Sequence, residues 1–211
     1  MLQQLATIKQ NNKKKKFFFL KQKFNLSSIL YVISLFSLNF SGYIKEISVH
    51  KNDISFIVAN AQDLTFLLVF LKNHFKFQCK EMIDICAVDY YFNVKESRYV
   101  LNYSLLSLKY KLRLRLKLYC DALSGVFSST KIFSAAGWLE REAWDMFGIF
   151  FKNHFDLRRI LTDYGFEGFP FRKDFPLSGY VELRYDSEKR IVIYDLLELT
   201  QEFRFFEFVN P

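Results

Sequence analysis

The feature that most constrains this chain of 211 residues is the stretch Trp138 to Tyr185, where a helical pattern gives way to an irregular one. Its first third places apolar residues at steps of three and four, which predicts a helix with one apolar face and charged residues mostly on the others. Those apolar residues are Leu139, Ala143, Met146, Phe147 and Phe150. Gly148 follows where such a helix could end in a left-handed turn.

The segment Asp163 to Tyr180 has no such period. It contains three of the seven Gly and two of the three Pro of the chain, so it is neither regular helix nor central strand. Its aromatic residues are Tyr164, Phe166, Phe169, Phe171, Phe175 and Tyr180. Because an irregular segment has no core of its own, we expect it to bury these side chains against another surface.

The same stretch resembles a known family, the 30 kDa subunit of respiratory complex I. The family signature is E-R-E, two residues, an acid, two apolar residues, six residues, His, three residues, a basic residue, one residue and two aliphatic residues. The matching positions are Glu140, Arg141, Glu142, Asp145, Met146, Phe147, His154, Arg158, Ile160 and Leu161. The family sequences D-Y-G-F-E-G and R-K-D-F-P-L-S-G-Y match Asp163 to Gly168 and Arg172 to Tyr180. Weaker similarity extends back to about Tyr43.

Four positions depart from the family pattern. Gly137 replaces a usual Asn, Phe155 a usual Pro, Phe169 a usual His and Phe171 a usual Leu. The absence of His at position 169 removes any case for a metal or proton-transfer role there. The drift towards Phe, with abundant Lys and Asn, indicates coding by an AT-rich genome such as that of an organelle.

The resemblance implies a non-catalytic core subunit of proton-pumping NADH:ubiquinone oxidoreductase, complex I. It places the chain in the peripheral arm, on the matrix side of the mitochondrial inner membrane, where it would brace the quinone-reducing module. The expected partners are the 49 kDa-type subunit and the subunit with the terminal iron–sulfur cluster. Flavin and iron–sulfur clusters are expected in partner subunits, with no cofactor in this chain. The alternatives are a mitochondrial ribosomal or RNA-binding protein and, more distantly, a free-standing hydrolase.

The signature supplies the candidate site, which we interpret as structural and interface residues. These are Glu140, Arg141, Glu142, Asp145, His154, Arg158, Arg159, Asp163, Arg172, Lys173 and Asp174. An acid/base or metal cluster is disfavoured because Glu140 and Glu142, two residues apart, point to different faces of a helix. The three His residues also form no metal-binding pair. We instead expect ion pairs that hold the helix end against the following segment and a neighbouring subunit, with no catalytic, cofactor or metal residue.

Charge and cysteine content narrow the function further. The net charge is +8, of which +7 comes from the Lys residues between Met1 and Phe24, so the remainder is nearly neutral. A nucleic-acid-binding domain usually spreads cations over its folded surface. Cys79, Cys86 and Cys120 form neither a C-x-x-C pair nor an iron–sulfur spacing, which predicts reduced thiols and no electron-transfer centre.

We predict three parts. Residues 1–41 form a Lys-rich tail, poor in the Arg of import sequences, and a short amphipathic helix over Leu26 to Phe40, too short to span a membrane. Residues 42–151 form an α+β domain, and residues 152–211 form an extended C-terminal arm that packs on partner subunits. Because the tail is poor in Arg, we expect the chain to be encoded in the mitochondrial genome rather than imported. Because the apolar segment is short, we expect a subunit that is peripheral to the membrane and has no transmembrane helix.

Within the domain, periodicity predicts five strands and two helices. The strands are Tyr43–Val49, Ile54–Ala59, Met82–Val88 (buried), Arg98–Leu105 and Tyr110–Cys120, and the helices are Asp63–Phe75 and 131–148. In the last strand Leu alternates with four cations, Lys111, Arg113, Arg115 and Lys117. The arm should contain a hairpin of Val181–Tyr185 and Arg190–Tyr194, followed by an irregular end.

This order of elements favours an α+β fold, in which a mixed or antiparallel sheet carries both helices on one face and an irregular arm follows. A doubly wound nucleotide fold would require strict alternation of strands and helices. The chain also lacks both G-x-G-x-x-G and G-x-x-x-x-G-K, so no pyrophosphate-binding loop is predicted.

Overall fold

The computed structural model describes residues 18–19, 34, 36, 40–50, 53–91, 97–204 and 206. Most of the predicted Lys-rich tail, most of the expected helix over Leu26 to Phe40, and residues Lys51–Asn52 between the first two predicted strands lie outside the described residues. Within the described residues, no helix combines the length and the apolar character that a membrane span requires.

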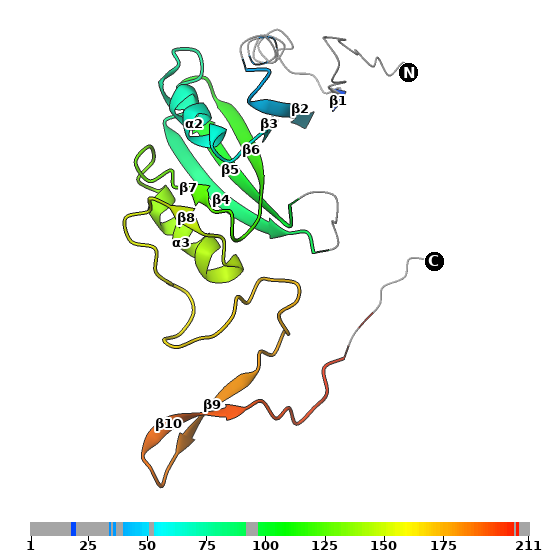
Figure 1. Ribbon diagram of the computed structural model, residues 1–211, viewed down its shortest axis with the longest axis vertical. Coiled ribbons are helices and arrows are strands. Elements are labelled where there is room, and N and C mark those ends of the chain that lie inside the picture. The colour runs from blue at the N-terminus through cyan, green and yellow to red at the C-terminus, as the bar shows by residue number, and fades with distance from the viewer. Residues whose placement is uncertain are drawn as a thin grey trace.

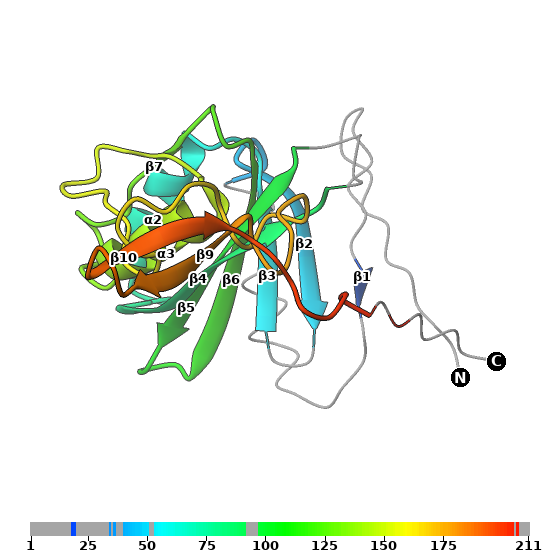
Figure 2. The same ribbon diagram turned by 90° about the horizontal axis from the view of Figure 1, so that it is seen from below.

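The domain is built on a six-stranded mixed sheet with the order β1-β2-β3-β6-β5-β4 (Figures 1 and 2). The strands are β1 (Phe18–Phe19), β2 (Ile44–His50), β3 (Asp53–Val58), β4 (Glu81–Asp89), β5 (Tyr99–Ser107) and β6 (Leu112–Cys120). The pairs β1–β2 and β3–β6 are parallel, and the other neighbours are antiparallel. The five predicted strands are therefore present, with each boundary within two residues of the prediction.

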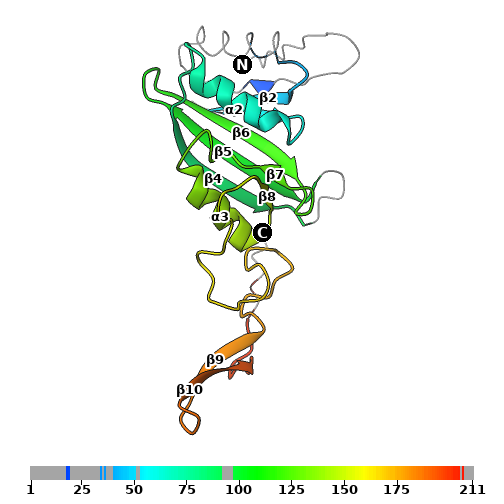
Figure 3. The same cartoon turned by 60° about the vertical axis from the view of Figure 1, so that its left-hand side comes forward.

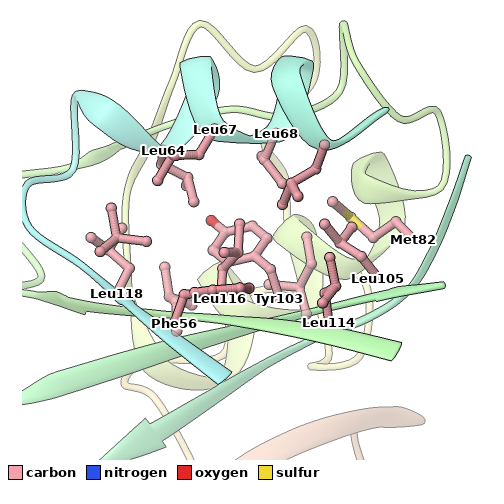
Figure 4. Packing of buried hydrophobic residues seen from close by; sticks show 14 of the residues in the cluster. Phe56, Leu64, Leu67, Leu68, Met82, Tyr103, Leu105, Leu114, Leu116 and Leu118 are labelled. Carbon is pink, nitrogen blue, oxygen red and sulfur yellow. The ribbon is translucent and has the colours of Figure 1, made fainter. Parts of the chain in front are cut away.

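Both helices cover the same face of this sheet, as predicted. Helix α2 (Asp63–Asn73) buries a stripe of Leu64, Leu67, Leu68 and Leu71. These side chains meet Leu114, Leu116 and Leu118 of β6 and Tyr103 of β5 (Figure 4). Helix α3 (Ala136–Phe147) packs beside β4, and its Ala136 and Ala143 join the same core. The alternating leucines of β6 and the leucine stripe of α2 thus define one apolar layer.

Residues before the first antiparallel strand also contribute to this core. Phe36 and Phe40 are buried, and the Phe36 ring centroid lies 4.4 Å from that of Phe56. The Phe40 ring centroid lies 4.5 Å from that of Phe70 on α2. The apolar core therefore includes side chains from the segment that precedes Tyr43.

Three local predictions differ from the structure. The strand predicted as buried, Met82–Val88, is the edge strand β4, and its outward residues Ile83, Cys86 and Val88 are exposed because, among the residues that the structure describes, no layer covers that face. Helix α3 begins at Ala136 rather than at residue 131, since residues 131–135 form turns. A parallel pair of β7 (Val126–Phe127) and β8 (Phe151–Lys152) was not predicted.

The outer face of the sheet is less cationic than the sequence predicts. Lys111 lies in the turn before β6, with φ of 51°, and not on the strand. Arg115 forms an ion pair with Asp53 on the parallel neighbour β3, at 3.3 Å. Asp84 on β4 shares this face, because it pairs in register with Ser104, the neighbour of Arg115. Acids therefore offset the cations of the outer face.

The C-terminal arm is irregular up to Tyr180 and then forms the predicted hairpin of β9 (Val181–Asp186) and β10 (Ile191–Leu196). The hairpin lies at the end of the molecule remote from α2 (Figures 1 and 3). We call residues 152–176 the proximal arm and residues 177–206 the distal arm. The proximal arm runs past the end of α3, whereas the distal arm projects from the domain.

Candidate functional site

The signature residues of α3 are arranged differently from the predicted pattern. The expectation that the charged residues point away from the apolar face is wrong for Glu140 and Asp145, which are both fully buried. Glu142 is exposed and Arg141 is half-buried. The two buried carboxylates accept hydrogen bonds from loop segments far from them in sequence, so they fix segments that have little secondary structure of their own.

Glu140 holds the loop after β7. Its Oε1 accepts hydrogen bonds from the Ser129 N–H at 2.7 Å and from the Ser129 hydroxyl at 2.6 Å. Its Oε2 accepts a hydrogen bond from the Ser128 hydroxyl at 2.6 Å. Burial raises the pKa of Glu140 above its ordinary value, although the hydrogen bonds from Ser128 and Ser129 oppose this. We call this arrangement the Glu140 clamp.

His154 completes the Glu140 clamp from the start of the proximal arm. The ring is fully buried, and its Nε2 lies 3.8 Å from Glu140 Oε2 and 3.3 Å from the Gly137 carbonyl oxygen. Its Nδ1 accepts a hydrogen bond from the Asp156 N–H at 3.1 Å. Because Nδ1 is an acceptor, the ring proton belongs on Nε2, where it faces Gly137 and Glu140.

Asp145 fixes the proximal arm more directly. Its Oδ2 accepts hydrogen bonds from three consecutive backbone N–H groups, those of Ile160, Leu161 and Thr162, at 3.1, 2.7 and 3.0 Å. Its Oδ1 accepts the Thr162 hydroxyl at 2.7 Å and lies 3.5 Å from Arg159 Nη1. Burial alone would raise the pKa of Asp145, but these hydrogen bonds hold the pKa below its ordinary value. This is the Asp145 clamp.

A third clamp, which we name the Arg98 clamp, joins the sheet edge to the end of the proximal arm. Arg98, directly before β5, forms a bidentate pair with buried Asp89 on β4, with both bonds at 2.8 Å. The same guanidinium bonds Asp174 at 2.9 and 3.2 Å. The Lys173 N–H donates to Asp89 at 2.9 Å.

The ion pairs of the Arg98 clamp shift the pKa values of all three side chains. Both aspartates have pKa values lowered by Arg98, in the case of Asp89 against the opposing effect of burial, and the carboxylates raise the pKa of Arg98. The planar guanidinium therefore binds one buried and one partly exposed carboxylate at once, which is the geometry that favours Arg over Lys.

The end of α3 is capped by the arm. Gly148 adopts the left-handed conformation expected of it, with φ of 72°. The Phe171 N–H donates to the Met146 carbonyl at 3.1 Å, and Arg172 Nε donates to the Phe147 carbonyl at 2.7 Å. A Cβ on Gly148 would lie 2.7 Å from the Phe169 ring and 2.5 Å from Arg172 Nη2, so close approach of the arm favours glycine here in addition to φ. A cation at the C-terminal end of a helix also opposes its dipole favourably.

Two of the departures from the family pattern lie against each other. A Cβ on Gly137 would be 3.4 Å from the Phe155 ring, and this ring stacks on His154 with centroids 5.0 Å apart. A third departure, Phe169, packs against the guanidinium of Arg172 at 4.3 Å and against Trp144 at 5.8 Å. The substituted positions are thus part of the clamped region.

The remaining predicted residues are peripheral to the clamps. Arg158 pairs with Asp156 on the surface, at 3.0 Å, and its carbonyl accepts a hydrogen bond from Arg141. Asp163 is exposed and accepts the Tyr164 N–H. In the part of the chain that the structure describes, no ion pair forms to Glu142, and the Lys173 side chain is exposed. Sequence reasoning missed Asp89, Arg98, Ser128 and Ser129, because no local pattern connects them to the signature.

The cysteines do not converge on one site. Cys79 and Cys120 are buried, and burial raises the pKa of each thiol to about 12. Cys86 lies on the outer face of β4, where burial and the Asp84 carboxylate raise its pKa to about 11. No group of three potential metal ligands occurs among the described residues.

The arrangement of the clamps, with each carboxylate bonded to protein donors, is suited to holding the arm in place.

Comparisons with known proteins agree with the pattern of the signature. A sequence model of the family described as "Respiratory-chain NADH dehydrogenase, 30 Kd subunit" matches residues 57–181. NADH-ubiquinone oxidoreductase subunit 9 of Reclinomonas americana is 51% identical over 172 residues, which cover 82% of this chain and 83% of that protein. The protein of the same name from Acanthamoeba castellanii is 46% identical over 190 residues, covering 89% and 95%.

A plant relative and a solved structure extend the comparison. NADH dehydrogenase [ubiquinone] iron-sulfur protein 3 of Patellifolia webbiana is 52% identical over 152 residues, covering 72% of this chain and 78% of that protein. A chain in the structure of the membrane-bound sulfane sulfur reductase, an archaeal respiratory membrane complex, superposes with a TM-score of 0.58 and 24% identity. That match covers 72% of this chain and 86% of the other, and it supports the fold alone.

Proposed function

The chain belongs to the family of the 30 kDa subunit of respiratory-chain NADH dehydrogenase, and we propose that it is a non-catalytic core subunit of the matrix-side peripheral arm of mitochondrial complex I. In this position it braces the quinone-reducing module while other subunits transfer electrons from NADH to ubiquinone. We further propose that it is peripheral to the inner membrane and encoded in the mitochondrial genome.

One observation carries this proposal: the family signature is used to position the C-terminal arm. Glu140 and Asp145 are fully buried, and their oxygen atoms accept hydrogen bonds from the loop and arm segments that they hold. A catalytic or metal-binding carboxylate needs a free lone pair directed at a substrate or an ion. Carboxylates bonded in this way support a structural role.

The proposed partners are the 49 kDa-type quinone-site subunit and the subunit with the terminal cluster. The exposed aromatic and aliphatic residues of the distal arm support docking on other subunits, because a projecting apolar segment requires a covering surface. The plant relative is named an iron-sulfur protein, but we propose that flavin and clusters belong to partner subunits. Thiols held at pKa values of about 12 by burial, as in Cys79 and Cys120, are poor thiolate ligands.

The alternative of a mitochondrial ribosomal protein gains no support. The outer sheet face would be its RNA-binding surface, and there Arg115 is paired with Asp53, with Asp84 nearby in register. RNA binding also weakens steeply as salt rises. Association of this chain with a flavin-containing complex at high salt is therefore the result that separates the two functions.

The direct test is native electrophoresis of mitochondrial inner membranes with a stain for NADH oxidation. Mass spectrometry of the stained band should identify this chain together with the proposed partners, before and after a high-salt wash. The purified chain, by contrast, should show no flavin or iron–sulfur absorbance after gel filtration. Recovery of the chain with ribosomal subunits, or a stable redox spectrum of the isolated chain, would show that the proposal is wrong.

A further inference from the structure

The β9–β10 hairpin has one face made entirely of large apolar side chains. The antiparallel register pairs Val181 with Leu196, Leu183 with Tyr194 and Tyr185 with Val192. Because alternate residues of a strand share a face, these six side chains lie on the same side. We call them the apolar hairpin face. All six are exposed, by 48% for Val181 to 80% for Leu196.

The opposite face has a different character. It carries Glu182, Arg184 and Asp186 of β9 and Asp195 of β10, together with Ile191 and Ile193. Arg184 Nε and Asp195 Oδ2 form an ion pair at 2.7 Å across the strands. The hairpin is thus amphipathic, with the polar face suited to water and the apolar face suited to burial.

The base of the hairpin is fixed to the rest of the arm. The Tyr194 hydroxyl donates to the Tyr164 carbonyl at 3.3 Å, and the Tyr180 ring, directly before β9, packs on Phe175 of the proximal arm with ring centroids 5.4 Å apart. The clamped proximal arm therefore presents the hairpin in a defined direction. A two-stranded hairpin alone is at best marginally stable in water, so this element requires a covering surface.

The size of the face argues against a second copy of this chain as the occupant. With exposed fractions of 48% to 80%, the six side chains of this face present on the order of 600 Å² of accessible surface. A stable dimer buries about 800 Å² per partner. The occupant must therefore also hold the chain at other surfaces, as a neighbouring subunit in a larger complex does.

The net charge of the distal arm indicates which charge the edge of the partner surface should carry. Between Leu177 and Arg204 the chain has six acidic and four basic residues, a net charge of −2 in a chain of net charge +8. The distal arm is therefore slightly acidic, whereas the chain after Phe24 as a whole is nearly neutral. A partner surface that is apolar at its centre and basic at its rim would complement it, because opposite potentials favour association.

We propose that the apolar hairpin face docks on an apolar, basic-rimmed patch of another subunit of the same complex, with the polar face directed away from it. This inference rests on the proposed function, and it names the surface of this chain that makes the contact. It assigns the dominant contact of the arm to β9–β10 rather than to the proximal phenylalanines, of which Phe169 already packs on Trp144, Arg159 and Arg172.

The first test compares two substitutions in cells where this chain is the sole source of the subunit. Leu183 and Ile191 are 54% and 53% exposed and lie on opposite faces of the hairpin, so they form a matched pair. Leu183→Lys should lower the fraction of chain in the NADH-oxidising band by about tenfold or more, because a charge would enter an apolar contact. Ile191→Lys should leave that fraction near wild type.

The second test measures burial directly and works in an assembled complex. Cys86→Ser removes the exposed native thiol, and Val192→Cys or Ile191→Cys then introduces a single reporter on either face. Both reporters should react with maleimide in the free chain. In the purified complex, the reporter at position 192 should be protected and the reporter at position 191 should react.

The outcomes separate this inference from the proposed function. If the wild-type chain is absent from the NADH-oxidising band, the proposed function fails and the inference fails with it. If the wild type and both Lys variants assemble equally and both reporters react equally, the function stands and the docking surface is wrong. Equal loss with both Lys variants, or a concentration-dependent dimer of the free chain abolished by Leu183→Lys, would also overturn the proposal.

Discussion

The α+β domain and the distal arm contain similar side chains and use them in opposite ways. In the domain, Phe36, Phe56 and Phe77 are buried between the sheet and α2. In the distal arm, Tyr185, Tyr194 and Phe206 are more than half exposed. The proximal arm lies between the two and is irregular, yet it is fixed by the Glu140, Asp145 and Arg98 clamps. The comparison teaches that buried carboxylates can order a segment that has no core of its own.

The largest expected effect comes from moving a truncation across the boundary between the two arms. A chain ending at Leu161 loses the two Thr162 donors of the Asp145 clamp, the Lys173 and Asp174 bonds of the Arg98 clamp and the cap of α3 by Arg172. We expect its free energy of unfolding to fall by about 3–5 kcal/mol, because several hydrogen bonds to buried or partly buried groups are lost together, and this is a large part of the total stability of many domains. Circular dichroism and denaturant titration measure this loss.

The matched truncation ends at Pro176 and keeps all three clamps. Its free energy of unfolding should stay within about 0.5 kcal/mol of the full chain, while its entry into the complex should be lost. The sequence alone predicts that even the chain ending at Leu161 keeps its sheet and helices. If that shorter chain melts cooperatively at the wild-type temperature, the clamps contribute little and the distinction between the arms is wrong.

The next effect compares the same substitution in the core and at the far end of the chain. Phe36 is 1% exposed and packs on Phe56, whereas Phe206 is 72% exposed. Phe36→Ala should lower the free energy of unfolding by about 3–5 kcal/mol, and Phe206→Ala should change it by less than about 0.5 kcal/mol. Equal effects in chemical denaturation would mean that Phe36 is not part of the core.

Much of the domain follows from local pattern. The alternating leucines of β6 and the stripe of α2 are strong periodic signals, and Gly148 ends α3 where a left-handed residue was predicted. The hairpin of β9 and β10 was also predicted, since two short β-rich runs enclose polar turn residues. In each case the residues that define the element are close together in the sequence, so a short window contains the information.

The clamps could not be predicted in this way. Charged residues on a helix are normally exposed, so Glu140 and Asp145 were assigned to outer faces, and only their distant partners explain why they are buried. Arg98 is 76 residues from Asp174, and no spacing rule connects them. The pair β7–β8 has two residues in each strand, which is too short for an alternating pattern.

A smaller effect tests the carboxylate that holds the proximal arm. Asp145→Ala removes the acceptor of three backbone N–H groups and of the Thr162 hydroxyl. We expect a loss of about 2–3 kcal/mol, because these donors are partly buried and cannot reverse direction to find another partner. Glu142→Ala, on the exposed face of the same helix, should cost less than about 0.5 kcal/mol in the same denaturation experiment. Similar losses for both variants would remove the special role of Asp145.

The smallest expected effect is a difference between Glu140 and Asp145 in how their contributions to the free energy of unfolding depend on pH. The donors to Glu140 include two serine hydroxyls, which can reverse to accept a hydrogen bond from an amide, so Glu140→Gln should cost only about 1 kcal/mol at pH 7.

Burial raises the pKa of Glu140 in the folded state. Its contribution to stability is therefore fully present below the unfolded pKa of about 4.3 and is lost as pH rises through the folded pKa. The pKa of Asp145 is lowered, so its contribution has the opposite dependence and is lost as pH falls through the folded value. The difference in unfolding free energy between wild type and Glu140→Gln should then be greatest near pH 4 and smallest near pH 7, since the other carboxylates contribute equally to both proteins. A difference that grows with pH would show that the serine donors outweigh burial, and that Glu140 holds its loop in the same way that Asp145 holds the arm.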